Sequence, residues 1–68
     1  MSEITFLVEP DLEGGYTAQA LGHAIFTEAD TWDELKVAVL DAVRCHLEEK
    51  DWPATVRLHV LQDEVVPA

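Results

Sequence analysis

The sequence predicts an α+β fold, with a single βββαβ domain over residues 1–68. Two turns that contain glycine separate three short segments of alternating apolar and polar residues, and this pattern predicts an antiparallel meander. A single helical stretch follows, and one more alternating segment comes after it. Because a strand–helix–strand crossover is right-handed, the last strand is expected to lie parallel to the first. The predicted sheet is therefore mixed and four-stranded, of order 3-2-1-4, with one helix packed on one face.

Three segments before the helix have the composition of strands. Residues 3–9 are rich in β-branched and aromatic side chains that alternate between two faces. The Pro, Asp and Gly residues within 10–15 have the chemistry of a hairpin turn, which leads to a second strand at residues 16–20. A shorter turn at residues 21–23 leads to the third strand, expected at residues 24–28.

A capping box marks the start of the helix. The hydroxyl of Thr31 is expected to accept a hydrogen bond from the backbone N–H of Glu34, and the Glu34 carboxylate to bond back to the N–H of Thr31. From there to about Lys50 the apolar residues recur with a helical period, and Pro53 is expected to stop the helix. The stripe that should face the sheet comprises Trp32, Leu35, Val39, Ala42, Val43 and His46.

The last strand is expected over residues 55–61, with Val56, Leu58 and Val60 facing the helix. Residues 62–68 are expected either to extend this strand or to form a tail.

One helix leaves the second face of the sheet uncovered. The side chains expected there are a mixture of apolar and polar types: Thr5, Leu7, Thr17, Gln19, Leu21, Ile25, Thr27, Arg57, His59 and Leu61. A mixed face beside an edge strand commonly meets another chain. On the helix, Val37 falls among polar residues and is a second candidate for such contact. Self-association into a dimer or tetramer is therefore predicted, with an interface at Leu7, Ile25, Val37 and Leu61.

The composition restricts the kinds of partner. Fourteen acidic against four basic residues give a net charge of -10, which opposes binding to nucleic acid and favours a basic protein. The predicted contact is an acidic rim made of Glu28, Asp30, Asp33 and Glu34. No signal peptide and no membrane span is expected. The one cysteine, Cys45, suits a reducing compartment, so the expected location is the cytoplasm.

No arrangement of residues predicts catalysis, a metal site or a cofactor. Cys45 and His46 are adjacent on the helix, so their side chains diverge by about 100° and cannot readily share a proton. We interpret His46 as a core or helix-end residue bonded to backbone or water, and Cys45 as a small packing residue. The histidines and the cysteine lack the short paired spacings of zinc sites. Trp32 and Trp52 are expected to close the two ends of the core.

Three stretches of the sequence resemble the HicB-like antitoxin family. They are Phe6-Leu7-Val8-Glu9, Gly14-Gly15-Tyr16-Thr17-Ala18 and Asp30-Thr31-Trp32-Asp33-Glu34-Leu35, and the similarity covers roughly residues 3–61. The resemblance implies a truncated ribonuclease H-like sheet, assembly into dimers or tetramers, and binding of HicA-type toxins, which are small basic proteins that cleave mRNA. The chain departs from the family at Ala20-Leu21-Gly22-His23-Ala24, which is shorter than the usual connection, and the DNA-binding module that follows the sheet in full-length members is not expected here.

The sequence therefore predicts a non-enzymatic, HicB-like interaction protein that binds a small basic toxin. Two alternatives stay open. The first is a small regulatory or structural subunit of a larger assembly. The second is a hydrolase that uses the acidic rim with Mg²⁺.

Overall fold

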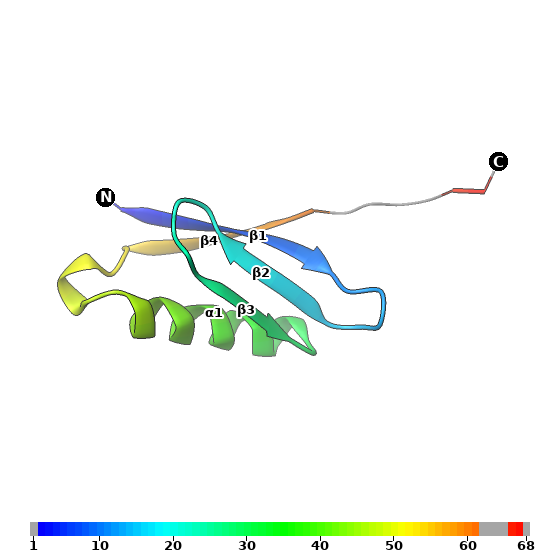
Figure 1. The fold of residues 1–68 in the computed structure, drawn as a ribbon, viewed down its shortest axis with the longest axis horizontal. Helices are drawn as coiled ribbons and strands as arrows, with labels where there is room; N and C mark the ends of the chain where they lie inside the picture. Colours follow the sequence, from blue (N-terminus) through cyan, green and yellow to red (C-terminus); the bar gives the residue numbers. More distant parts are fainter. Residues whose placement is uncertain (1, 62–65, 68) are drawn as a thin grey trace.

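The computed structural model describes residues 2–61, 66 and 67, and within them the predicted α+β fold is confirmed. The chain runs through β1 (Glu3–Pro10), β2 (Tyr16–Ala20), β3 (Phe26–Ala29), α1 (Trp32–His46), a short 3-10 helix η1 (Glu49–Asp51) and β4 (Thr55–Val60). The four strands form one sheet of order β3-β2-β1-β4, and α1 lies along one of its faces (Figure 1). The expectation for residues 62–65 and 68 lies outside the described residues.

Strand β1 is the centre of the structure because it pairs on both sides. It is antiparallel to β2 and parallel to β4, as the right-handed crossover requires. The alternating residues Ile4, Phe6 and Val8 all point to the helix side and are buried. Burial of one such side chain contributes roughly 1.5–3 kcal/mol, so the three together are a large share of the stability of a small domain.

The core is completed by residues from three other segments, and its helical part follows the predicted stripe. Leu35, Val39 and Val43 of α1 are buried, whereas His46 at the end of the stripe is exposed. The full buried set is Ile4, Phe6, Val8, Ala18, Ala20, Ile25, Leu35, Val39 and Val43.

The helix begins where the capping box predicts. The Thr31 hydroxyl accepts a hydrogen bond from the backbone N–H of Glu34 at 3.1 Å. The prediction of a return bond from the Glu34 carboxylate to the Thr31 N–H is wrong, since no such bond occurs among the hydrogen bonds of the described residues. The Glu34 side chain instead lines a hollow beside the helix.

The helix ends earlier than predicted, at His46 rather than near Lys50. Leu47 is extended, with φ -114° and ψ 146°, and the chain makes a separate 3-10 turn before Pro53. Two physical causes favour this early end. The acidic residues Glu48 and Glu49 oppose the negative end of the helix dipole, and the Trp52 indole N–H donates to the Leu47 carbonyl at 3.0 Å.

Strand β4 is less covered than the other strands. Val56 and Leu58 face the helix as predicted but are only half-buried, and Val60 keeps an exposed fraction of 36%. On the opposite face, Arg57 forms an ion pair with Glu3 of β1. Of the helices in the described part of the chain, none is long and apolar enough to cross a membrane.

Candidate functional site

The face of the sheet opposite α1 carries a row of side chains that crosses all four strands. Leu7 is paired with Gln19 of β2 on one side and with His59 of β4 on the other, and Gln19 is paired in turn with Phe26 of β3. Paired residues point to the same face of a sheet, so these four side chains lie side by side. We call the face that carries them the open face.

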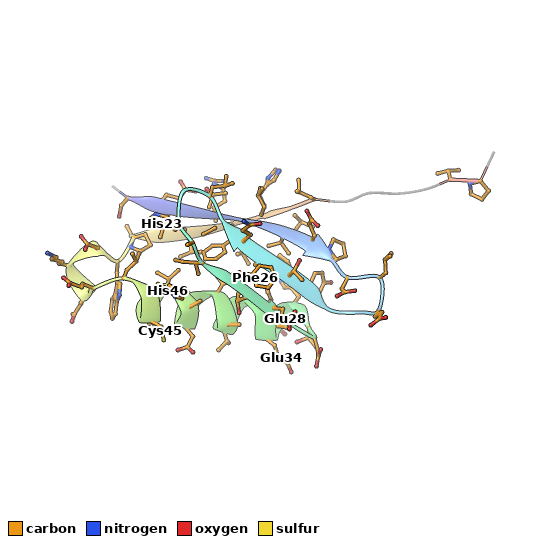
Figure 2. The ribbon with its side chains drawn as sticks, viewed as in Figure 1. His23, Phe26, Glu28, Glu34, Cys45 and His46 are labelled. Atoms are coloured by element: carbon orange, nitrogen blue, oxygen red, sulfur yellow. The ribbon has the colours of Figure 1, made fainter. Side chains whose placement is uncertain are left out.

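Phe26 is the most prominent apolar group of the open face. Its exposed fraction is 61%, a large value for a side chain of this size, and Figure 2 shows it on β3 near the middle of the molecule. Leu7 is partly exposed, and Leu61 follows β4 with an exposed side chain. The predicted mixture of apolar and polar residues is therefore present on this face.

The prediction for β3 is wrong in one respect, because the two faces of this strand are exchanged. Ile25 is 2% exposed and belongs to the core, so it cannot form an oligomer interface as expected. Thr27 also faces the helix, because it pairs with the buried Ala18. The cause is the register, since the Ala20 N–H donates to the Ile25 carbonyl at 2.9 Å and thus places Ile25 opposite a core residue. A shift of one residue reverses every side chain of a strand.

Phe26 is the residue that the sequence reasoning missed. The length of the turn between Ala20 and Ile25 is a signal that indicates its position. When Ala20 and Ile25 close the hairpin, the next pair along the two strands is Gln19 and Phe26, and both residues then lie on the open face.

An acidic hollow lies beside the open face, at the end of β3. Its volume is about 620 Å³, and Glu28, Asp30 and Glu34 of the predicted rim line it. Asp33 is the member that the structure separates from the others, because it lines a neighbouring shallow depression with Glu34 and Val37. Figure 2 shows Glu28 and Glu34 in the same part of the molecule, away from Cys45 and His46.

The loop between β1 and β2 adds two carboxylates to the hollow, Asp11 and Glu13. The loop is held by its own hydrogen bonds, in which the Asp11 Oδ1 accepts from the Glu13 N–H at 3.0 Å and the Asp11 N–H donates to the Gly15 carbonyl at 3.0 Å. This is an Asx-type turn, which the Pro–Asp–Gly chemistry of the loop favours.

Gly15 brings that loop against the end of β3. It has φ +85°, and a Cβ atom at this position would lie 2.7 Å from the carbonyl oxygen of Ala29. Only glycine allows both the backbone conformation and the close approach. The contact explains why Asp11 and Glu13 line the same hollow as Glu28 and Asp30, a grouping that the sequence analysis did not contain.

The acidic hollow is a charged surface without the geometry of a metal centre. Within residues 2–61, 66 and 67, no group of three or more His, Cys, Asp or Glu residues is placed so that it could hold a metal ion.

The remaining candidate residues do not gather into a site. His46 Nδ1 donates to the Ala42 carbonyl oxygen at 3.1 Å, which confirms a helix-end residue bonded to the backbone. Cys45 is exposed, so its interpretation as a packing residue is wrong. Val37 is 68% exposed on the outer side of α1, as its position among polar residues predicts. Its part in an oligomer interface stays a prediction.

The two tryptophans differ in their surroundings. Trp32 is half-buried and packs edge-on against Tyr16, with ring centroids 5.6 Å apart, so it closes one end of the core as expected. Trp52 is exposed, and the Arg44 guanidinium lies over its ring at 5.9 Å from the ring centroid. Trp52 therefore contacts Arg44 and Leu47 at the end of α1 and does not close the core as expected.

The comparison with known proteins places the chain in a family. An Archaeoglobus fulgidus protein named UPF0150 protein is 56% identical over 50 residues, which are 74% of this chain and 74% of the relative. This chain belongs to the UPF0150 family. A second UPF0150 protein, from Thermotoga maritima, is 43% identical over 47 residues, or 69% of this chain and 67% of the relative. No family model matches the chain, and neither does any solved structure. The name UPF0150 states no activity, ligand or partner.

Proposed function

We propose that this UPF0150 protein is a non-enzymatic binding protein whose partner is a small basic protein. The observation that carries the proposal is the continuity of the open face with the acidic hollow. Phe26 and Glu28 are two residues apart on β3 and point to the same open side, and Glu28 also lines the hollow. A partner that covers Phe26 therefore also meets the carboxylates.

The two parts of this surface have different roles in binding. Five carboxylates around one hollow, on a chain with net charge -10, attract a basic partner and raise the association rate. The apolar contacts at Phe26 and Leu7 set the dissociation rate, because they must be separated before the partner leaves. Binding should therefore become slower, but should not be lost, when the salt concentration rises from low to physiological.

The resemblance to HicB-like antitoxins gives the partner a class. A HicA-type toxin is a small basic protein, which suits the charge of this surface, so we propose that the chain acts as an antitoxin-like binder. The single exposed cysteine, Cys45, supports residence in the reducing cytoplasm, where such a toxin acts. The predicted assembly with itself remains part of the proposal.

Co-expression with the product of the neighbouring gene tests the proposal. The neighbour should stop growth when it is expressed alone, should be tolerated together with this chain, and should co-purify with it. A neighbour that is neither toxic nor retained would contradict the antitoxin function and would favour a subunit of a larger assembly.

Two triple charge-reversal variants test whether the partner binds at the acidic hollow. Glu13, Glu28 and Asp30 line the hollow, and their joint replacement by lysine should slow association by at least about tenfold at low salt. The control replaces Glu48, Glu49 and Asp51, which lie at the far end of α1 and in the 3-10 turn, and changes the net charge by the same amount. Equal effects of the two triple variants would show that only the overall charge matters.

A further inference from the structure

Strand β4 forms one edge of the sheet. This strand stands at the end of the sheet order and pairs with β1 on one side only, as far as the described residues extend. The Leu61 N–H donates to the Val8 carbonyl at 2.7 Å, so the backbone groups of Leu61 point toward β1. Alternate residues of a strand point their backbone groups to opposite sides. The N–H and C=O groups of Val56, Leu58 and Val60 therefore point outward, to the free edge.

An apolar groove runs along this edge on the helix side. It has a volume of about 180 Å³ and is lined by Lys36, Val39 and Leu40 of α1 and by Val56 and Leu58 of β4. Leu40 is 43% exposed, and Val60 at the end of β4 is also exposed. An unpaired strand edge beside exposed apolar side chains is a template for another strand.

The helix-facing residues of β4 are symmetric about Leu58. In residues 55–61, Thr-Val-Arg-Leu-His-Val-Leu, valine lies two positions to each side of Leu58. An antiparallel copy of the same strand can therefore place Leu58 opposite itself and Val56 opposite Val60. All of these residues have outward backbone groups, so they would form hydrogen-bonded pairs, while Arg57 and His59 would form the narrow pairs between them.

We propose that two copies of this chain pair antiparallel through β4, in the register that places Leu58 opposite itself. The dimer then has one continuous sheet, with both copies of α1 on the same side and the two apolar grooves joined along the seam. The neighbouring register, which places Arg57 opposite itself, sets two like charges face to face and is disfavoured.

The symmetry about Leu58 favours a second copy as the occupant of this edge, and the distribution of charge permits it. Two chains of net charge -10 repel each other, so they approach best where carboxylates are fewest. Lys36 is the one charged residue that lines the groove, and no carboxylate lines it among the described residues. The acidic hollow is lined by residues of the β1–β2 loop, β2, β3, α1 and the segment between β3 and α1, without any residue of β4. A basic partner at the hollow and a second copy at β4 therefore use different surfaces.

The strength of the dimer follows from the size of the contact. A standard interface buries about 800 Å² from each partner, roughly 15% of the 5328 Å² surface of this chain. One strand and one shallow groove provide less than that, so dissociation in the micromolar range is expected. Because both copies are acidic, added salt should strengthen the dimer, which is opposite to its effect on a basic partner.

Disulfide trapping tests the register, in a full-length background that carries Cys45→Ala. Arg57→Cys and His59→Cys are prepared as separate variants and mixed under oxidising conditions. Arg57 of one copy would lie opposite His59 of the other in a narrow pair, whose Cα separation of about 4.5 Å permits a disulfide. The mixture should give a crosslinked dimer, and each variant alone should not, since its two cysteines would be diagonal.

The control mixture combines Thr17→Cys and Gln19→Cys, which lie on the open face of the internal strand β2. It should show only the background of random collisions. A mixture of Arg57→Cys and His59→Cys that does not exceed this background would overturn the proposal, as would efficient crosslinking of Arg57→Cys with itself.

A proline variant tests the edge without cysteine chemistry. Val60→Pro removes an outward N–H and none of the bonds to β1, and a symmetric dimer loses two hydrogen bonds. The dissociation constant of the dimer, measured by analytical ultracentrifugation, should rise at least about tenfold. Phe26→Ser on the open face should leave it unchanged. A mass that stays monomeric up to millimolar concentration in the unaltered chain would refute the pairing, whatever the outcome of the partner experiments.

Discussion

Replacement of Gly15 by alanine tests the contact that assembles the acidic hollow, and Gly14 provides a matched control. Both glycines have positive φ, +85° and +101°, so an alanine at either position is strained in its backbone. This strain costs roughly 1–2 kcal/mol, reduced by about 0.4–1 kcal/mol because alanine also restricts the unfolded chain. Gly14→Ala should therefore destabilise the protein by about 1 kcal/mol.

Gly15→Ala has an additional cost that Gly14→Ala lacks. Its Cβ would lie 2.7 Å from the Ala29 carbonyl oxygen, a backbone atom that cannot rotate away, whereas nothing lies within 4 Å of a Cβ at Gly14. Relief of such an overlap by shifts of the loop costs typically 1–3 kcal/mol. The total of about 2–4 kcal/mol is a large part of the stability of a domain of this size.

Urea unfolding followed by far-UV circular dichroism measures the difference between the two variants. With a slope of about 1 kcal/mol per molar urea, the midpoint should fall by about 1 M for Gly14→Ala and by about 2–4 M for Gly15→Ala. The second variant should also bind a basic partner less well, because the loop carries Asp11 and Glu13. Equal midpoints for the two variants would refute the close approach of the loop to β3.

Three further predictions concern the cap, the core and the charge. Thr31→Ala should lower the free energy of unfolding by about 1 kcal/mol, whereas Glu34→Ala should have a smaller effect, since only the Thr31 half of the capping box forms; similar losses in denaturant melts would contradict this. Ile25→Ala should destabilise the monomer by about 2–5 kcal/mol because Ile25 is a core residue. A variant with normal stability but an altered oligomer mass would show instead that Ile25 lies in an interface. Duplex DNA and RNA should not shift in gel mobility at physiological salt, because four basic residues against fourteen acidic ones cannot displace counterions, and a shift with a steep salt dependence would disprove it.

The sequence by itself determined the features that depend on neighbours along the chain. The alternation of Ile4, Phe6 and Val8, the helical spacing of Leu35, Val39 and Val43, and the Thr31 cap are local patterns, and each was found where it was expected. Together with the handedness of the crossover they were sufficient for the element order and the sheet order. The acidic residues Glu28, Asp30 and Glu34 were also recognised, because they lie close together in the chain.

The tertiary structure decided the features that depend on pairing between distant residues. Local composition allowed either face for Ile25 and Phe26, and the register that sets Ile25 opposite Ala20 chose between them. The approach of Gly15 to Ala29 joined Asp11 and Glu13 to the hollow across a separation that no periodic pattern spans. The exposed edge of β4 likewise became visible only with the sheet formed, because an edge strand and an internal strand share the same alternation and differ only in whether a neighbour supplies the second row of hydrogen bonds.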